Sequence, residues 1–176
     1  MFLASDEPGN IIRVLFVDFA KAFDLIDHNL LMRKFIDNDF PLHLSCWSLS
    51  FLEDRKQFVK VANGVSSTAK ICCGCPQGTL SGPNNFKLMI NDLRFLLSYI
   101  KYVDDTSVAS MSNDPDDTSL QGALNDLTAW CALNSMRLNT AKTNEMVIYF
   151  GKKLIFSHIK SLECNDSVVN RVDTFK

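Results

Sequence analysis

The stretch SYIKYVDDTSVAS, from Ser98 to Ser110, carries two adjacent aspartates, Asp104 and Asp105, between two segments rich in apolar residues. This pattern predicts a β-hairpin with the Asp-Asp pair at its tip. Two close carboxylates raise each other's proton affinity unless a cation neutralises them, so a divalent metal ion is a natural partner of the pair. Aspartate is also simply a good turn former, and the rest of the chain has to decide between these two interpretations.

A second acidic residue, Asp18, stands near the end of the apolar run IIRVLFVDF, Ile11 to Phe19. The run is rich in β-branched and aromatic residues, which predicts a buried central strand. An aspartate in such a place is costly to bury unless it is paired or bound to a metal ion. Alternatively, Asp18 begins the following loop and caps the next turn.

Two helices are predicted next. The first begins after an N-cap at Asp27 and the second at Pro41. Aromatic and aliphatic residues recur in both at helical spacing, which indicates core packing. The expected core residues are Leu30, Leu31, Phe35 and Ile36 in the first helix and Leu42, Trp47 and Phe51 in the second.

The next segment predicts a hairpin and a glycine-rich turn. Gln57 to Ala62 alternates like a strand, Asn63-Gly64 is a strong turn signal, and residues 67–73 can return as the second strand. The following GCPQGTLSGP, residues 74–83, contains three of the seven glycines and two of the five prolines. Such a segment predicts backbone that approaches a neighbour closely, although an ordinary connection to the helix expected over residues 84–97 fits as well.

After the Asp-Asp hairpin, an acidic proline turn is expected to be solvated, and Thr118 with Gln121 predicts a capping box at the start of a helix. A polar turn bearing Lys142 then leads into a strand at Glu145 to Phe150. The buried stripe of the helix is expected at Leu120, Leu124, Leu127 and Cys131.

Composition predicts one globular core: the chain has 176 residues, of which 47% are hydrophobic and 22% charged. A net charge of −2 provides no basic footprint over the whole chain. The six cysteines lack zinc-ligand spacing, and the CCGC cluster, Cys72 to Cys75, is interpreted as buried small residues in a reducing compartment. With no secretory signal and no apolar run long enough to span a bilayer, we expect an intracellular protein without a membrane partner, in the nucleus or the cytoplasm.

The order of these segments resembles the reverse transcriptases of non-LTR (LINE-type) retrotransposons. FVDFAKAFDLIDH resembles motif A of that family, GCPQGTLSGPNNFKLMINDL motif B, YVDDT motif C and WCALNSMRLNTAKT motif D. The final VDTFK resembles the approach to motif E. Each motif is weak by itself, but four in the right order over most of the chain are highly specific.

The resemblance implies an α+β fold, the polymerase palm, in which helices pack behind an antiparallel sheet. Asp18 would lie on a central strand and the Asp-Asp pair on the adjacent hairpin. Residues 1–176 would form a single partial reverse transcriptase domain that ends before motif E, with the fingers and thumb largely missing. The basic surface that grips nucleic acid would then lie mainly in those missing parts, which would account for the negative net charge.

The resemblance also implies the chemistry of an RNA-directed DNA polymerase. Asp18 and Asp104 would bind two Mg²⁺ ions, with Mn²⁺ as a substitute, Asp105 would complete the acidic group, and the backbone carbonyl of Phe19 would supply a further ligand. The partners would be an RNA template, a DNA primer and a deoxynucleoside triphosphate. The metal ions would assist transfer of a nucleotide to the primer 3′-hydroxyl.

Four other residues match substrate positions of the family. Phe23 matches the aromatic residue beneath the incoming sugar that excludes a 2′-hydroxyl, and Ala22 stands beside it. Gln77 matches a contact to the incoming nucleotide, and Lys142 matches a lysine that neutralises or protonates the departing pyrophosphate.

Two other functions remain open. The chain could be an inactive or repurposed retroelement fragment that serves as a scaffold or binding module. It could also be a metal-dependent phosphohydrolase, although that chemistry needs neither the Pro-Gln-Gly turn nor an aromatic residue under the sugar.

Overall fold

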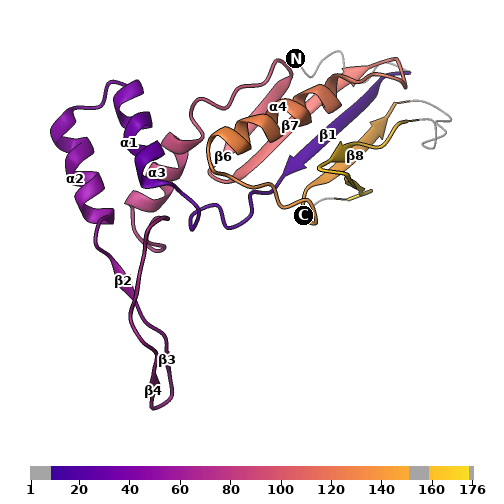
Figure 1. Ribbon diagram of the computed structural model, residues 1–176. Helices are drawn as coiled ribbons and strands as arrows, with labels where there is room; N and C mark the ends of the chain where they lie inside the picture. The colour runs from indigo at the N-terminus through magenta and orange to yellow at the C-terminus, as the bar shows by residue number, and fades with distance from the viewer. Residues whose placement is uncertain (1–8, 151–158, 175–176) are drawn as a thin grey trace. The chain divides into compact units, whose positions relative to one another are not determined.

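The computed structural model describes residues 9–150 and 159–174, which form two compact units (Figure 1). The sheet unit comprises residues 9–20, 93–133 and 137 onward, and the helical unit comprises residues 21–92 and 134–136. Residues 1–8 lie outside the described residues. They belong to the N-terminal segment in which the sequence indicates no secretory signal. The last two residues of the VDTFK stretch lie outside the described residues as well.

The sheet unit is built on a five-stranded sheet with the strand order β11-β8-β1-β7-β6. All neighbours in this sheet are antiparallel except β11 and β8, which are parallel. The elements of the unit are β1 (Ile11–Val17), β6 (Ser98–Tyr102), β7 (Asp105–Ser112), α4 (Ser119–Leu133), β8 (Asn144–Tyr149), β9 (Glu163–Cys164), β10 (Ser167–Val168) and β11 (Asn170–Arg171). The predicted α+β class is confirmed.

Strand β1 lies at the centre of this sheet, between β7 and β8, as its apolar sequence predicts. Alternate residues of β1, from Ile11 to Val17, are buried. Helix α4 packs against the neighbouring strand β7. The sequence also identified its buried stripe correctly: Leu120, Leu124, Leu127 and Cys131 are all buried. Burial raises the pKa of the Cys131 thiol to about 12.

The predicted capping box of α4 does not form, because the Gln121 side chain binds elsewhere. Its amide donates to the carbonyl of Glu163 and accepts from the Glu163 amide, both at 2.9 Å. Asp117 instead accepts a hydrogen bond from the Ser119 amide at the start of the helix. Gln121 therefore fastens β9 to α4, a contact between residues 42 positions apart.

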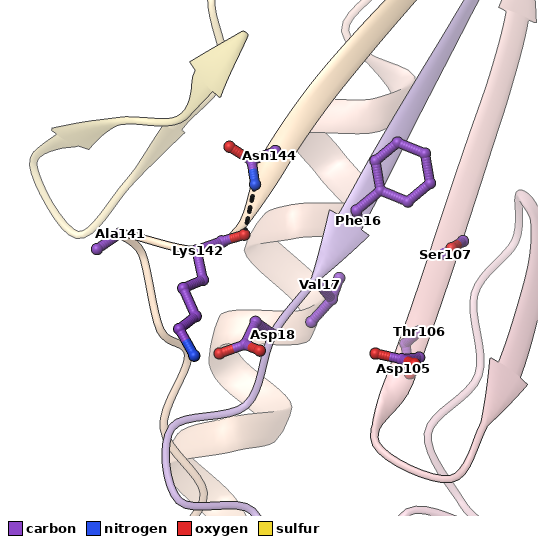
Figure 2. A pocket seen from close by; sticks show the side chains of 9 residues that line it. All are labelled: Phe16, Val17, Asp18, Asp105, Thr106, Ser107, Ala141, Lys142 and Asn144. Carbon is purple, nitrogen blue, oxygen red and sulfur yellow. Dashed lines mark hydrogen bonds between the residues drawn. The ribbon is translucent and has the colours of Figure 1, made fainter. Parts of the chain in front are cut away.

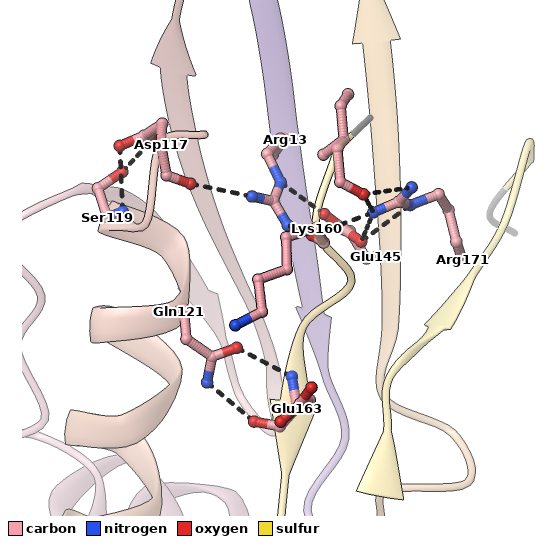
Figure 3. Close-up of polar contacts among 9 residues, drawn as sticks. Arg13, Asp117, Ser119, Gln121, Glu145, Lys160, Glu163 and Arg171 are labelled. Atoms are coloured by element: carbon pink, nitrogen blue, oxygen red, sulfur yellow. Dashed lines mark hydrogen bonds and ion pairs between the residues drawn. The ribbon is translucent and has the colours of Figure 1, made fainter. Parts of the chain in front are cut away.

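A buried ionic cluster holds the C-terminal segment on the sheet (Figure 3). Glu145, fully buried in β8, accepts from Arg13 Nε at 2.6 Å and from Arg171 Nη2 at 2.9 Å. Arg13 also donates to the carbonyl of Asp117 at 3.1 Å and to that of Lys160 at 2.9 Å. The cluster thus joins three strands and two loops of the sheet unit.

The helical unit contains α1 (His28–Asp37), α2 (Leu42–Leu52) and α3 (Ser81–Met89), and α1 packs on both of the others. The predicted N-cap is confirmed, because Asp27 accepts from the amides of Asn29 and Leu30. Helix α3 begins and ends earlier than the sequence predicts. An ion pair between Lys34 of α1 and Asp92 connects this helix to the segment that follows α3.

The prediction that the apolar residues of α2 lie in the core is wrong. Leu42 is 65% exposed, Trp47 is 69% exposed, and Phe51 is exposed as well. In α1, Ile36 is also exposed. The sequence of α2 is apolar on nearly every side, and α1 can cover only one of those sides.

Between α2 and the glycine-rich segment, the chain forms a two-stranded arm whose far end is formed by β3 and β4 (Figure 1). Its strands are β2 (Lys56–Gln57), β3 (Lys60–Val61), β4 (Gly64–Val65) and β5 (Ala69–Lys70). The turn is Ala62-Asn63 rather than Asn63-Gly64, because Val61 pairs with Gly64.

The prediction of a buried CCGC cluster is wrong for two of its cysteines. Cys72 and Cys73 are exposed, and only Cys75 is buried. The strand predicted over residues 67–73 therefore does not continue past β5 into a buried segment. Over the described ranges, no helix has the length and apolar character needed to cross a membrane.

Candidate functional site

Two of the predicted acidic residues lie opposite each other on neighbouring strands. Strands β1 and β7 pair in register from Ile11 with Ser112 to Val17 with Thr106. One step beyond the last pair come Asp18 and Asp105. Because directly opposed residues of an antiparallel pair point to the same face, both carboxylates belong to one face of the sheet. Figure 2 shows them on either side of one cavity.

The cavity opens on the face of the sheet that α4 does not cover. Phe19, the residue after Asp18, is buried and packs its ring on Trp130 of α4, with ring centroids 6.4 Å apart. Alternation along the strand therefore turns Asp18 away from α4. The cavity has a volume of about 640 Å³, and its lining includes Lys142 as well as Asp18 and Asp105.

The turn that carries Lys142 is fastened to the backbone of Asp18 on both sides. The Asn139 amide donates to the Asp18 carbonyl at 2.8 Å, and the Asp18 amide donates to Thr143 Oγ1 at 3.3 Å. Within the turn, the Asn144 side chain donates to the Lys142 carbonyl at 2.6 Å. Lys142 extends from this turn toward the Asp18 carboxylate (Figure 2).

Thr143 and Asn139 are positioning residues that sequence reasoning did not find. Their partner, Asp18, is more than 100 positions away, and no local pattern connects them. Thr143 is buried, so its hydroxyl is a fixed acceptor for the Asp18 amide.

Replacing Thr143 with valine is expected to lower the free energy of unfolding by about 1–3 kcal/mol, because the substitution keeps the shape and leaves the Asp18 amide without its acceptor. Urea denaturation measures this loss, and hydrogen exchange at the Asp18 amide should accelerate. Thr143→Ser should restore both. The matched variant Thr140→Val, in the same turn, is expected to change stability by less than about 0.5 kcal/mol. Equal effects of the two valine variants on stability would contradict a stabilising role for the hydrogen bond between Thr143 and the Asp18 amide.

Asp104 is separated from Asp105 by the geometry of the hairpin. Tyr102 pairs with Asp105, so the turn consists of Val103 and Asp104, and Asp105 is the first residue of β7. The sequence placed both aspartates at the tip. Asp104 lies there, but Asp105 lines the cavity. Val103 has a φ of +56°, a left-handed conformation that costs a residue other than glycine about 1–2 kcal/mol.

Within residues 9–150 and 159–174, no cluster of three or more histidine, cysteine, aspartate or glutamate side chains could hold a metal ion. Of the three expected aspartates, Asp18 and Asp105 line the cavity, and Asp104 lies in the adjoining turn. The acidic residues in the lining of this cavity are Asp18 and Asp105, whose carboxylate oxygens could serve as metal ligands.

The remaining predicted residues, Ala22, Phe23 and Gln77, belong to the helical unit. Ala22 is buried, and the half-buried Phe23 packs its ring on Phe86 at a centroid distance of 5.2 Å. Gln77 is exposed, and its side-chain amide donates to Asp24 Oδ1 at 3.2 Å.

The glycine-rich segment brings Gln77 to the neighbourhood of Phe23. Gly74 has a φ of +83°, and a Cβ atom there would lie 2.8 Å from the Asp24 carbonyl oxygen. The next amide, of Cys75, donates to the Phe23 carbonyl at 2.8 Å. The predicted close approach of this backbone is confirmed, and its neighbour is the segment around Asp24.

The chain matches known proteins over most of its length. The model of a family described as "Reverse transcriptase (RNA-dependent DNA polymerase)" matches residues 4–168. The chain is 30% identical over 141 residues to the "Probable RNA-directed DNA polymerase from transposon BS" of Drosophila melanogaster, an alignment that covers 73% of this chain and 16% of that protein. It is 30% identical over 139 residues to the "RNA-directed DNA polymerase from mobile element jockey" of the same organism, covering 72% of this chain and 15% of that protein. The chain thus spans about a sixth of the length of these curated relatives.

Proposed function

Because this chain belongs to the reverse transcriptase family, we propose that its sheet unit carries the catalytic site of an RNA-directed DNA polymerase. The reaction would add a deoxynucleotide to the 3′-hydroxyl of a DNA primer paired with an RNA template. The observation that carries the proposal is the opposition of Asp18 and Asp105 in one open cavity beside Lys142.

The donors of this cavity fit a magnesium ion. Magnesium binds hard oxygen ligands and is commonly held by one or two carboxylates together with substrate phosphates rather than by a cage of protein ligands. Asp18, just past the end of β1, and Asp105, the first residue of β7, provide such a pair. By family resemblance we propose Asp104 and the Phe19 carbonyl as further ligands of two Mg²⁺ ions, with Mn²⁺ as a substitute. Bound there, the ions supply positive charge that stabilises the attacking and leaving oxygens.

The chain's own residues would position the reactants. The primer 3′-hydroxyl would lose its proton to water as its oxygen attacks the α-phosphorus of the nucleotide. The bond from that phosphorus to the bridging oxygen would break, and pyrophosphate would leave. Lys142, whose ammonium group extends into the cavity, would neutralise charge on the departing pyrophosphate or donate a proton to it. The hydrogen bonds of Asn139 and Thr143 to Asp18 keep the lysine-bearing turn in register with the carboxylate.

Three residues of the helical unit would recognise the nucleotide. Gln77 would contact it near the template base, and Ala22 and Phe23 would lie beneath its sugar. The Phe23 ring is held by Phe86, so it cannot easily move aside for an added 2′-hydroxyl.

Replacing Phe23 with alanine is therefore expected to relax selection against ribonucleotides by about tenfold or more, because a fixed ring is a steric filter and alanine leaves space. The measurement is the ratio of kcat/KM for a deoxynucleotide to that for the matching ribonucleotide. Phe23→Tyr retains the bulk and should retain the ratio. An unchanged ratio in Phe23→Ala would remove Phe23 from the nucleotide site.

The function is tested by primer extension on an RNA template. We expect extension that requires deoxynucleotides, stops on addition of EDTA and resumes with excess Mg²⁺. A chain that binds the primed template but never extends it would support the scaffold alternative. Hydrolysis of nucleotides without a primer would support the phosphohydrolase alternative.

A further inference from the structure

The arm of the helical unit has a charge unlike that of the chain as a whole. We call residues 55–70 the basic arm: they include Arg55, Lys56, Lys60 and Lys70 and contain no aspartate or glutamate, whereas the whole chain has a net charge of −2. The three lysines are exposed, and Arg55 is half-buried. Positive charge is therefore concentrated on one projecting element.

Two of these lysines lie where like charges repel. Lys56 and Lys70 are direct partners in the β2–β5 ladder, so their side chains leave the same face. Like charges directly opposite each other destabilise a ladder. Asp54 pairs with Lys70 at 3.0 Å, but both side chains are largely exposed, and such a pair contributes little and exchanges readily. An anion between the two ammonium groups would relieve the repulsion.

The basic arm also exposes apolar surface between its cations. Phe58 is 60% exposed, and Val59, Val61 and Val65 are exposed on both sides of the turn. Bases stack on exposed aromatic rings in proteins that bind single strands, while cations follow the phosphates. Alternating lysines and an aromatic ring fit that chemistry.

The base of the arm opens into a cavity of about 530 Å³. Its lining includes three cations, Arg55, Lys70 and Lys21, against one carboxylate, Asp24, which accepts from Gln77. The arm thus leads into a cavity with an excess of positive charge beside the proposed nucleotide contact, all within the helical unit.

We propose that the basic arm and the cavity at its base bind a single-stranded nucleic acid, with Lys56, Lys60 and Lys70 on its phosphates and Phe58 stacked on a base. That this strand is the unpaired part of the template rests on the proposed function. The binding itself requires no catalysis.

The test is fluorescence anisotropy of a labelled single-stranded RNA with the 176-residue chain, in EDTA and without nucleotide. For these three phosphate contacts, affinity should fall about 20-fold between about 50 and about 200 mM salt. Lys56→Ala/Lys60→Ala should make the slope of log affinity against log salt shallower by about 1.4. Phe58→Ala should weaken binding about tenfold without changing the slope.

The matched control is Arg33→Ala/Lys87→Ala, which removes two exposed charges from helices of the same unit. Its slope should stay that of the unaltered chain. Equal slopes for the two double variants, or a duplex bound as tightly as the single strand, would overturn the proposal. The proposal would also be overturned if the chain were a dimer and Lys56→Ala/Lys60→Ala were a monomer, because the arm would then be a self-association surface.

A second arm of the experiment separates this inference from the proposed function. Asp18→Asn should bind the RNA with unchanged affinity and slope. If the chain binds as stated but never extends a primer, the proposed function fails and the binding surface stands. If it extends a primer and the arm variants bind normally, the binding surface fails by itself.

Discussion

Asp105→Asn is expected to lower RNA-templated primer extension by about a thousand-fold, which corresponds to about 4 kcal/mol of transition-state stabilisation. Asparagine keeps the size of the side chain and its place on β7 but removes the charge that faces Asp18 across the cavity. Asp18→Asn should have an effect of the same size. Single-turnover extension at saturating Mg²⁺ measures both.

Asp116→Asn is the matched control, because Asp116 is exposed in the turn before α4 and should tolerate the same substitution without loss. A readout that does not depend on turnover is Mn²⁺ binding in the presence of a deoxynucleotide, followed by electron paramagnetic resonance. Asp105→Asn should weaken it, and Asp116→Asn should not. If Asp105→Asn extends primers as fast as the control, the opposed pair is not the catalytic site.

Asp104 is the residue for which sequence resemblance and geometry give different answers. The family resemblance would make Asp104 a metal ligand, whereas the structure places Asp104 in the turn and Asp105 in the cavity. The two positions differ by one residue of hairpin register, and register alternates side chains between faces. A sequence pattern locates such a turn but does not fix which residue is its first strand residue.

Local patterns predicted much of the sheet unit. The apolar run at Ile11 predicted a central strand, and the stripe from Leu120 to Cys131 predicted the buried face of α4. The order of the motifs identified the family, which the match over residues 4–168 confirms. These features follow from short-range periodicity and from residue types that lie next to each other in the chain.

Local sequence patterns could not predict contacts between residues that are distant in the chain. The sequence showed that α2 is largely apolar but not whether anything covers Trp47, which is exposed. The Asn63-Gly64 signal marked a turn, but pairing of Val61 with Gly64 moved it by one residue. Thr143 and Gln121 act through partners far away in sequence, and tertiary pairing alone brings them together.

The buried glutamate of β8 is the strongest case of this kind, because nothing near Glu145 in the sequence indicates its partners. Glu145 is fully buried, and Arg13, its partner on β1, is 132 positions away. The second partner, Arg171, attaches the C-terminal segment to the same carboxylate. Desolvating these charges is costly, so the cluster is stable only while every member is present.

Glu145→Ala is accordingly expected to lower the free energy of unfolding by about 3–5 kcal/mol, because it leaves Arg13 buried without its counter-charge. Against a total stability of about 5–15 kcal/mol, this loss should be plain in urea denaturation of the chain. Glu53→Ala, which removes an exposed glutamate, should change stability by less than about 0.5 kcal/mol.

The double variant Arg13→Met/Glu145→Leu decides whether unpaired charge is the cause. Replacing a buried ion pair with apolar residues of similar volume is often neutral or stabilising, so the double variant should recover most of what Glu145→Ala loses. Arg171 can then turn toward solvent, since its side chain is already 24% exposed. If the double variant is instead as unstable as Glu145→Ala, the hydrogen bonds that Arg13 makes to the carbonyls of Asp117 and Lys160 hold the C-terminal segment, and the charge of Glu145 is secondary.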